Sequence, residues 1–252
     1  MPKLKKSTII SREYRKQIAE EKLEKAKEEE DIELISRYAK QTTRLTDEML
    51  KESKELIKSL GLPVIQAPKE ADAQMAFMNE KDDVWGCASS DYDCLLHGAP
   101  RLITNLTLSQ RRKLPSGSTV KIYPEIIELK QALKYLNINN DQLIALSILV
   151  GTDYNKGIRG IGPKTALKLV QQHKDFNELF KEVKADFNWK RVFAIFKSMP
   201  VMKNYQLKWE KPDVEKVKEI LVEKHEFNEE RVNKVLDKFN LVKKEGSLNK
   251  WI

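Results

Sequence analysis

The chain has 252 residues, 40% of them hydrophobic, so it is long enough to bury the core of one or two domains. Its 46 Lys and Arg residues exceed its 38 Asp and Glu residues, and the formal net charge of +8 fits either a polyanionic partner or an ordinary solvated surface. No apolar run is long enough to span a bilayer, and the basic N-terminus lacks the apolar core of a signal peptide, which argues against a membrane or exported protein. Cys87 and Cys94 lack the spacing of a zinc knuckle or a disulfide framework, so we expect an intracellular protein.

The N-terminal part of the chain reads as helix. Residues 11–61 are rich in Glu, Lys, Arg and Ala and contain no Gly or Pro before Gly61. Between residues 18 and 30 the only large apolar residues are Ile18 and Leu23, so this helix must lie in solvent or contact something outside the fold. A basic helical arm and a solvated linker helix fit this composition equally well.

A more regular amphipathic helix follows. Thr46 is a typical N-cap residue and Gly61 a typical terminator, so we expect the helix between them. Its inward-facing side chains are predicted to be Met49, Leu56 and Ile57.

The next part alternates strand and helix signals, as an α/β fold does. Residues 62–65 read as a short strand, Pro68 opens a predicted helix that runs to about Glu80, and residues 84–88 read as a second strand.

Carboxylates stand at the junctions of these elements. Glu70 and Asp72 fall in the first turn of the predicted helix, and Asp91 and Asp93 fall just past the second strand. Ligands of open α/β sheets collect beyond the carboxyl ends of the strands. Each acid alone is more typical of a helix start or a turn, but together with Asp153 they favour a pair of Mg²⁺ ions, which prefer carboxylate and water oxygens. Residues two apart on a helix diverge by about 200°, so Glu70 or Asp72 is expected to act through a water.

A glycine-punctuated loop joins two apolar helical runs between residues 143 and 170. Asn139 or Asn140 provides the helix start before the loop, and Gly151 stops that helix. Gly157, Gly160 and Gly162 follow, and Pro163 stands at the first turn of the next helix.

This loop predicts a phosphate site. Glycines let the main chain approach a ligand, and the free N–H groups of a helix start attract anions. Lys156, Arg159 and Lys164 add positive charge. A plain turn between two core helices is the alternative, and we favour DNA backbone binding because of the neighbouring acids.

Four strings resemble one family closely. They are APKEADAQ (67–74), SSDYDCLLHGAPRLITNLT (89–107), ILVGTDYN (148–155) and GIRGIGPKTAL (157–167). The chain is similar, over essentially its whole length, to the flap endonucleases of archaea and eukaryotes. These belong to the structure-specific 5′ nucleases that include the xeroderma pigmentosum group G nuclease.

The resemblance implies an α/β fold class, with a Rossmann-like (PIN-like) nuclease core, a helical arch and a helix-three-turn-helix DNA-binding element. The expected segments are the arch with its following helix (1–60), the nuclease core (61–138), the DNA-binding region (139–190), a C-terminal helical part of the core (191–240) and a clamp-docking tail (241–252).

The resemblance also implies roles for individual residues. The metal-binding acids match Glu70, Asp72, Asp91, Asp93 and Asp153, with Asp72 one methylene shorter than the family's usual glutamate. The basic residues expected near the scissile phosphate match Lys5 and Arg12. The DNA-binding element matches Lys156, Arg159, Gly160, Gly162 and Lys164, where a monovalent cation is expected between loop carbonyls and DNA. The docking box matches Leu248, Trp251 and Ile252, with Ile252 in place of a second aromatic residue.

The implied function is phosphodiester hydrolysis near single-strand/double-strand junctions, in Okazaki fragment processing and repair. Two Mg²⁺ ions, with Mn²⁺ as a substitute, are the expected cofactors. The expected partners are flapped or branched duplex DNA and a sliding clamp, bound by a monomer in the archaeal cytoplasm or nucleoid, or in the eukaryotic nucleus.

One expectation concerns an N-terminal segment. The family's members begin with a segment that carries two further metal-binding aspartates, and the resemblance starts just after it. The competing hypothesis is therefore a catalytically incomplete fragment that binds DNA and the clamp but does not cleave.

Overall fold

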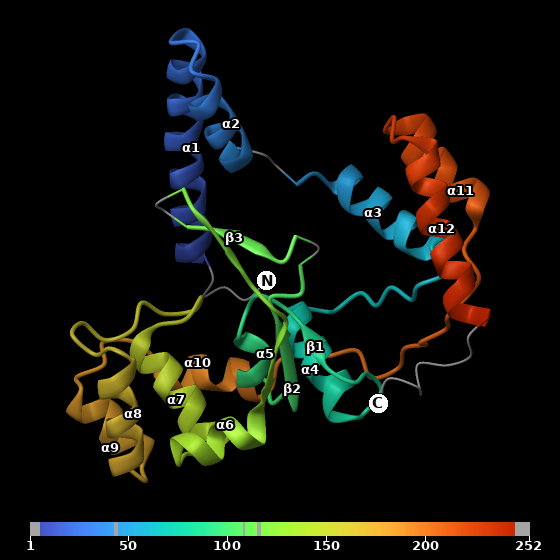
Figure 1. The fold of residues 1–252 in the computed structure, drawn as a ribbon. Coiled ribbons are helices and arrows are strands. Elements are labelled where there is room, and N and C mark those ends of the chain that lie inside the picture. The colour runs from blue at the N-terminus through green and yellow to red at the C-terminus, as the bar shows by residue number, and fades with distance from the viewer. Residues whose placement is uncertain (1–5, 43–44, 108, 115–116, 245–252) are drawn as a thin grey trace. The chain divides into compact units, whose positions relative to one another are not determined.

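The structure is a computed structural model that describes residues 6–42, 45–107, 109–114 and 117–244. Figure 1 shows its helices and strands. The chain divides into two compact units, Met1–Arg15 with Ala67–Met202 and Lys16–Gln66 with Lys203–Ile252. The five segments expected from the sequence divide the chain by expected function, and they stay a prediction.

The first unit contains a small mixed sheet. Strand β1 (Cys87–Ala88) pairs in parallel with β2 (Arg101–Thr104), and β2 pairs in antiparallel fashion with β5 (Glu125–Glu128). Side chains alternate along β2, so Leu102 is fully buried while Ile103 faces the other way. Helices α4 (Ala71–Glu80) and α5 (Asp93–Leu96) contact this sheet.

A buried amide fixes the turn between α4 and β1. The side chain of Asn79 donates to the carbonyl oxygens of Val84 and Trp85, at 2.9 and 3.0 Å, and accepts from the Arg101 amide at 2.9 Å. Because every polar atom of this buried side chain is satisfied, it can lie in the core without a desolvation penalty. The turn therefore holds β1, and the acids that follow it, against β2.

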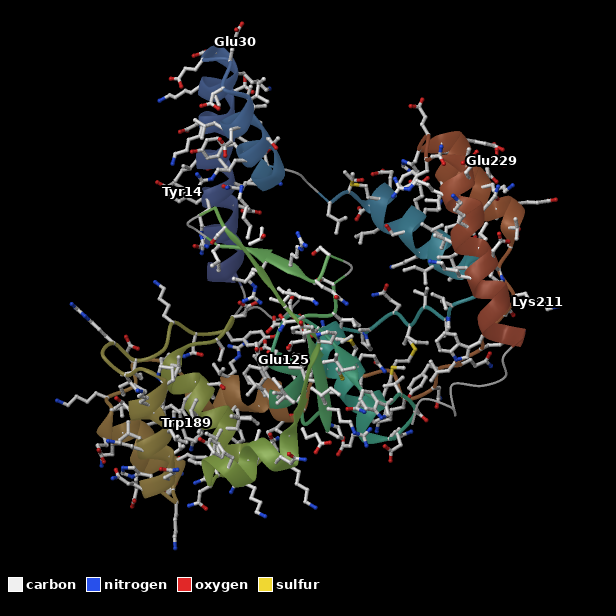
Figure 2. All side chains as sticks on the ribbon, viewed as in Figure 1. Tyr14, Glu30, Glu125, Trp189, Lys211 and Glu229 are labelled. Carbon is white, nitrogen blue, oxygen red and sulfur yellow. The ribbon has the colours of Figure 1, made fainter. Side chains whose placement is uncertain are left out.

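Five helices form the rest of the first unit's core. They are α6 (Leu129–Leu136), α7 (Asn140–Val150), α8 (Pro163–Gln172), α9 (Phe176–Glu182) and α10 (Trp189–Lys197). Helix α7 is apolar on most sides and buries Ile144, Ile148 and Leu149 completely. Trp189, labelled in Figure 2, stacks on Phe180 with ring centroids 4.5 Å apart. An aromatic pair of this kind stabilises a core by about 1 kcal/mol beyond its buried area.

A second, two-stranded sheet lies in the first unit. Strands β3 (Arg111–Lys113) and β4 (Thr119–Lys121) pair in antiparallel fashion, with Arg112 opposite Val120. All six residues are exposed. We call this pair of strands the basic ribbon.

The described residues of the second unit form helices and loops. This unit contains most of α1 (Lys6–Glu28), then α2 (Ile32–Thr42), α3 (Asp47–Ser59), α11 (Val214–Lys218), the π-helix η2 (Glu219–Lys224) and α12 (Glu229–Lys244). Val217, Val232 and Leu236 form its small core, against which Leu56 and Leu60 pack.

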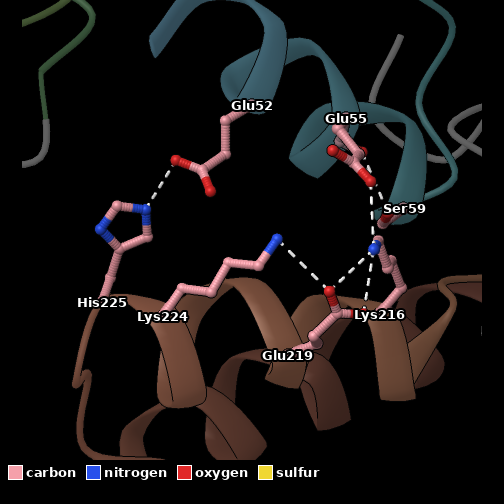
Figure 3. A network of polar contacts seen from close by, with 7 residues as sticks. All are labelled: Glu52, Glu55, Ser59, Lys216, Glu219, Lys224 and His225. Atoms are coloured by element: carbon pink, nitrogen blue, oxygen red, sulfur yellow. Dashed lines mark hydrogen bonds and ion pairs between the residues drawn. The ribbon is translucent and has the colours of Figure 1, made fainter. Parts of the chain in front are cut away.

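Polar contacts supplement that core. Figure 3 shows Lys216 Nζ between Glu55 Oε1 at 3.1 Å and Glu219 Oε2 at 2.9 Å. His225 Nε2 lies 2.8 Å from Glu52 Oε2. These groups are partly solvated, so their contribution to stability is small and they mainly fix how α3 lies against α11 and η2.

Several predicted elements are confirmed. Thr46 caps α3 by accepting from the Met49 amide at 3.2 Å, and Asn139 forms a capping box with Gln142 at the start of α7. Gly151 ends α7, and Pro163 is the first residue of α8. The α/β fold class is also confirmed.

Other expectations were wrong. Residues 62–65 form no strand, because they belong to the second unit, whose described residues contain only helices and loops. Met49 and Ile57 are 47% and 38% exposed, since of the three side chains predicted to face inward only Leu56 packs against the small core of this unit.

No described helix has the length and apolar character needed to cross a membrane.

Candidate active site and glycine loop

The five predicted acids lie at three junctions of the first unit. Glu70 is the N-cap residue of α4 and Asp72 lies in its first turn. Asp91 and Asp93 follow β1, and Asp93 opens α5. Asp153 comes directly after the end of α7. The predicted placement of Asp91 and Asp93 beyond β1 is therefore confirmed. The helix was expected to open at Pro68, but α4 begins at Ala71, so Glu70 precedes its first turn and only Asp72 lies in it.

Three of these acids act electrostatically on the side chain of Tyr154. Burial raises the pKa of Tyr154, and the charges of Glu70, Asp93 and Asp153 raise it further, together with a hydrogen bond to Glu70. The phenol therefore stays protonated at neutral pH and donates to the Glu70 carboxylate. The three acids come from separate elements, and the fold brings each of them near enough to act on this one hydroxyl.

Asp72 is held by a thiol. Cys94 Sγ donates to Asp72 Oδ1 at 3.2 Å. A hydrogen bond with Cys87, burial and the charge of Asp72 all raise the pKa of Cys94, so it stays a thiol and remains a donor. Cys94 and Cys87 are both buried. The short Asp72 side chain thus has a fixed orientation at the base of α4.

A tight turn connects Asp91 and Asp93. Ser89 Oγ accepts from the Asp91 amide at 3.0 Å, and Asp91 Oδ1 accepts from the Asp93 amide at 3.2 Å. Asp91 is exposed while Asp93 is half-buried. One carboxylate of the pair therefore faces solvent and the other faces the Tyr154 side.

A neutral histidine packs behind these groups. Burial lowers the pKa of His97, and its Nδ1 lies 3.1 Å from the Phe196 carbonyl oxygen. The neutral ring with its proton on Nδ1 is therefore the form that fits. The His97 and Phe196 rings lie 5.3 Å apart, and Tyr154 meets Phe196 edge-on at 5.5 Å.

The acids fit a hard divalent cation by chemistry but do not form a closed metal cage. Carboxylate oxygens are the ligands that Mg²⁺ and Mn²⁺ take. Among the described residues, no group of three or more His, Cys, Asp or Glu side chains is close enough to hold an ion. An ion at this site would therefore keep several waters, as Mg²⁺ commonly does.

The glycine loop between α7 and α8 has a defined backbone. Thr152 and Asn155 form a bridge, with N···O distances of 3.0 and 3.3 Å, and the Ile158 amide donates to the Leu149 carbonyl at 2.7 Å. Gly157 has φ +74°, and a Cβ there would meet Val150 O at 2.2 Å. The fold therefore requires glycine at this position.

Gly160 and Gly162 differ from Gly157. Gly160 has φ +85°, but open space surrounds the position of its missing Cβ. Gly162 is the N-cap residue of α8 with φ −92° and is equally open. Packing in the fold does not explain the choice of glycine at residue 162.

The basic residues of the loop project from it. Lys156, Arg159 and Lys164 are exposed, and within the described part of the chain none of them forms an ion pair. Lys164 lies in the first turn of α8, beside the free amides of the helix start. This arrangement attracts anions.

The remaining predicted site residues cannot be placed. Lys5, Leu248, Trp251 and Ile252 lie outside the described residues. The backbone of Arg12 lies in α1, and its side chain is outside the description.

Sequence reasoning missed the supporting residues. Tyr154 stands next to Asp153, and Cys94 stands next to Asp93. Adjacency to a predicted ligand was the available signal, but only the fold shows that these side chains reach Glu70 and Asp72.

Known proteins are similar to this chain over most of its length. The chain is 44% identical over 240 residues to flap endonuclease 1 of Ignicoccus hospitalis, covering 94% of this chain and 69% of that protein. This chain belongs to the flap endonuclease family. The prediction of the family is thereby confirmed, and with it, at the level of the family, the predicted function in DNA replication and repair.

Other matches agree with membership of the flap endonuclease family. The XPG I-region family model matches residues 61–153, a range that contains all five acids. Flap endonuclease-1 from Methanococcus jannaschii superposes with a TM-score of 0.70 at 39% identity, over 86% of this chain and 65% of that one. The catalytic core of Rad2 in complex with DNA substrate superposes with a TM-score of 0.67 over 95% of this chain and 76% of that one, and at 21% identity it shows the fold alone.

Proposed function

We propose that this chain carries the catalytic acids and DNA-binding loop of a Mg²⁺-dependent 5′ flap endonuclease. The observation that carries the proposal is the convergence of Glu70, Asp93 and Asp153 on Tyr154. Carboxylates from three elements have no structural need to gather, because their mutual repulsion destabilises the fold unless a cation offsets it. The family supplies the reaction, hydrolysis of a DNA phosphodiester near a single-strand/double-strand junction.

The acids would hold up to two Mg²⁺ or Mn²⁺ ions, which supply Lewis acidity for the hydrolysis when bound. Asp93 and Asp153 would face the ions most directly, and exposed Asp91 would complete the site from the solvent side. Tyr154 keeps the Glu70 carboxylate oriented, and Cys94 does the same for Asp72. Lys5 and Arg12 stay predictions as contacts to the scissile phosphate.

The glycine loop would hold duplex DNA by its backbone. Exposed Lys156, Arg159 and Lys164 offer charge, and open space at Gly160 and Gly162 lets a phosphate approach the amides at the start of α8. A monovalent cation between loop carbonyls and DNA is proposed as part of the same contact.

Lys164→Ala is expected to weaken binding to every duplex sequence by about threefold to tenfold and to lower the salt slope by about 1, because one phosphate contact is lost. Fluorescence anisotropy with a labelled duplex in EDTA, over a range of salt concentrations, measures both quantities. Lys181→Ala, which removes an exposed charge from α9, is the matched control and should leave both quantities unchanged. An unchanged affinity for Lys164→Ala would remove the loop from the DNA interface.

Gly162→Val separates ligand approach from stability in the same assay. A valine has room and an allowed backbone there, so the fold should lose about 1 kcal/mol at most. The duplex affinity of Gly162→Val should nevertheless be lower than that of Lys164→Ala, because the valine side chain blocks the free amides at the start of α8.

The C-terminal tail is proposed to dock on a sliding clamp. Leu248 and Trp251 are spaced so that one helical turn presents both to a groove. Deleting residues 248–252 should leave duplex affinity intact and weaken clamp binding by about tenfold or more, since an aromatic anchor is lost. Surface plasmon resonance with an archaeal sliding clamp tests this, and equal clamp binding by the shortened chain would contradict it.

A second candidate function is DNA and clamp binding without cleavage. The open arrangement of the acids favours it. Cleavage assays separate it from the nuclease.

A further inference from the structure

A pocket of about 660 Å³ lies in the first unit next to the acids. It begins at Ser89 and Ser90, directly before Asp91, and includes Tyr92, which separates Asp91 from Asp93. The end of β2 and residues of the basic ribbon form the other walls. The pocket therefore borders the place where the phosphodiester would be cut.

The charged residues that line the pocket are all positive. Arg111 and Arg112 line it, and none of the twelve described residues that line it is an Asp or Glu. The Arg112 guanidinium donates to Asn105 Oδ1 at 3.0 Å, which holds it toward the pocket wall that Asn105 forms. An anionic ligand is thus favoured in the pocket itself, although carboxylates stand beside it.

Aromatic and apolar groups accompany the arginines. Tyr92 is 56% exposed and Leu106 is 65% exposed, and both line the pocket. Ile103 and Ile122 add apolar surface. Exposed apolar side chains gathered around a concave surface mark a binding site rather than a solvated face.

We propose that this pocket binds the unpaired nucleotides of a single-stranded DNA arm, with Tyr92 stacking on a base and Arg112 contacting a phosphate. A positive groove with an exposed aromatic is the combination that binds single strands without sequence preference. The volume is in the range of small-ligand sites, so it admits one or two splayed nucleotides and no duplex. This assignment rests on the proposed nuclease function and adds to it a contact that discriminates flapped from blunt DNA.

The test compares the affinity of the full chain for two labelled duplexes, one with a 5′ single-stranded arm and one blunt. EDTA is present, so neither cleavage nor metal binding contributes. Arg112→Ala and Tyr92→Ala should each reduce the flap-to-blunt affinity ratio by about fivefold to tenfold, and Tyr92→Phe should keep it because the ring still stacks. Lys113→Ala is the matched control: it removes one charge from the same strand at a residue that does not line the pocket, and it should leave the ratio unchanged.

The outcomes distinguish the two proposals. If Arg112→Ala and Tyr92→Ala leave the flap-to-blunt affinity ratio unchanged, the pocket assignment is wrong. The proposal that the glycine loop binds duplex DNA is not affected by that result. Equal loss with Lys113→Ala also overturns the pocket assignment, since only general charge would then matter. A duplex affinity that does not depend on Lys164 counts against the proposed function and not against the pocket.

Discussion

Replacing Gly157 by alanine is expected to destabilise the first unit by about 3 kcal/mol or more. A left-handed backbone at φ +74° costs a non-glycine residue about 1–2 kcal/mol. The added Cβ would also lie 2.2 Å from Val150 O and 2.5 Å from Val150 C, and both atoms belong to the end of a buried helix that cannot shift cheaply. Urea denaturation followed by circular dichroism measures the loss, at an unchanged denaturant slope.

Gly160→Ala is the matched control for this change. It has the same handedness of backbone at φ +85° but open space around the new Cβ, so it should cost only about 1–2 kcal/mol. If the two variants were equally stable, the contact between Gly157 and the end of α7 would not be the constraint that shapes the loop.

Asp153→Asn is expected to weaken divalent-ion binding by about a hundredfold. The substitution keeps the size of the side chain and removes one of the charges gathered around Tyr154. Loss of the supporting groups of a metal site alone commonly costs 10- to 100-fold in affinity, and loss of a ligand should be at the upper end or beyond. Calorimetric titration with Mn²⁺ measures the affinity.

Two further variants serve as comparisons for Asp153→Asn. Tyr154→Phe should weaken binding by only about tenfold, because it removes the orienting hydroxyl and leaves every carboxylate in place. Asp186→Asn, an exposed acid between α9 and α10, makes the same charge change away from the site and should have no effect. Equal losses for Asp153→Asn and Asp186→Asn would mean that only net charge attracts the ion.

The sequence predicted the local features of this fold well. Caps, helix ends and the glycine loop depend on residues a few positions apart, and Thr46, Asn139 and Gly151 act as their chemistry predicts. The acids were found for the same reason, since each follows or opens a recognisable element.

Long-range features were not accessible in this way. Residues 62–65 have the composition of a strand, yet the residue before them packs against the segment around Glu210. The Gly61 carbonyl oxygen accepts from the Glu210 amide at 2.9 Å, and a Cβ on Gly61 would meet Glu210 O at 2.1 Å. Nothing in the local pattern signals a partner so distant in the sequence. The roles of Tyr154 and Cys94 were missed for the same reason, because they depend on which elements the fold brings together.

Single-turnover cleavage of a labelled 5′-flap duplex in Mg²⁺ tests most directly whether the five acids form a catalytic site. The 252-residue chain is assayed as the wild type and as the variants Asp153→Asn and Asp186→Asn. We predict cleavage at the junction, loss of that cleavage with Asp153→Asn, and no loss with Asp186→Asn. Junction cleavage that survives Asp153→Asn unchanged would contradict the assignment of the acids.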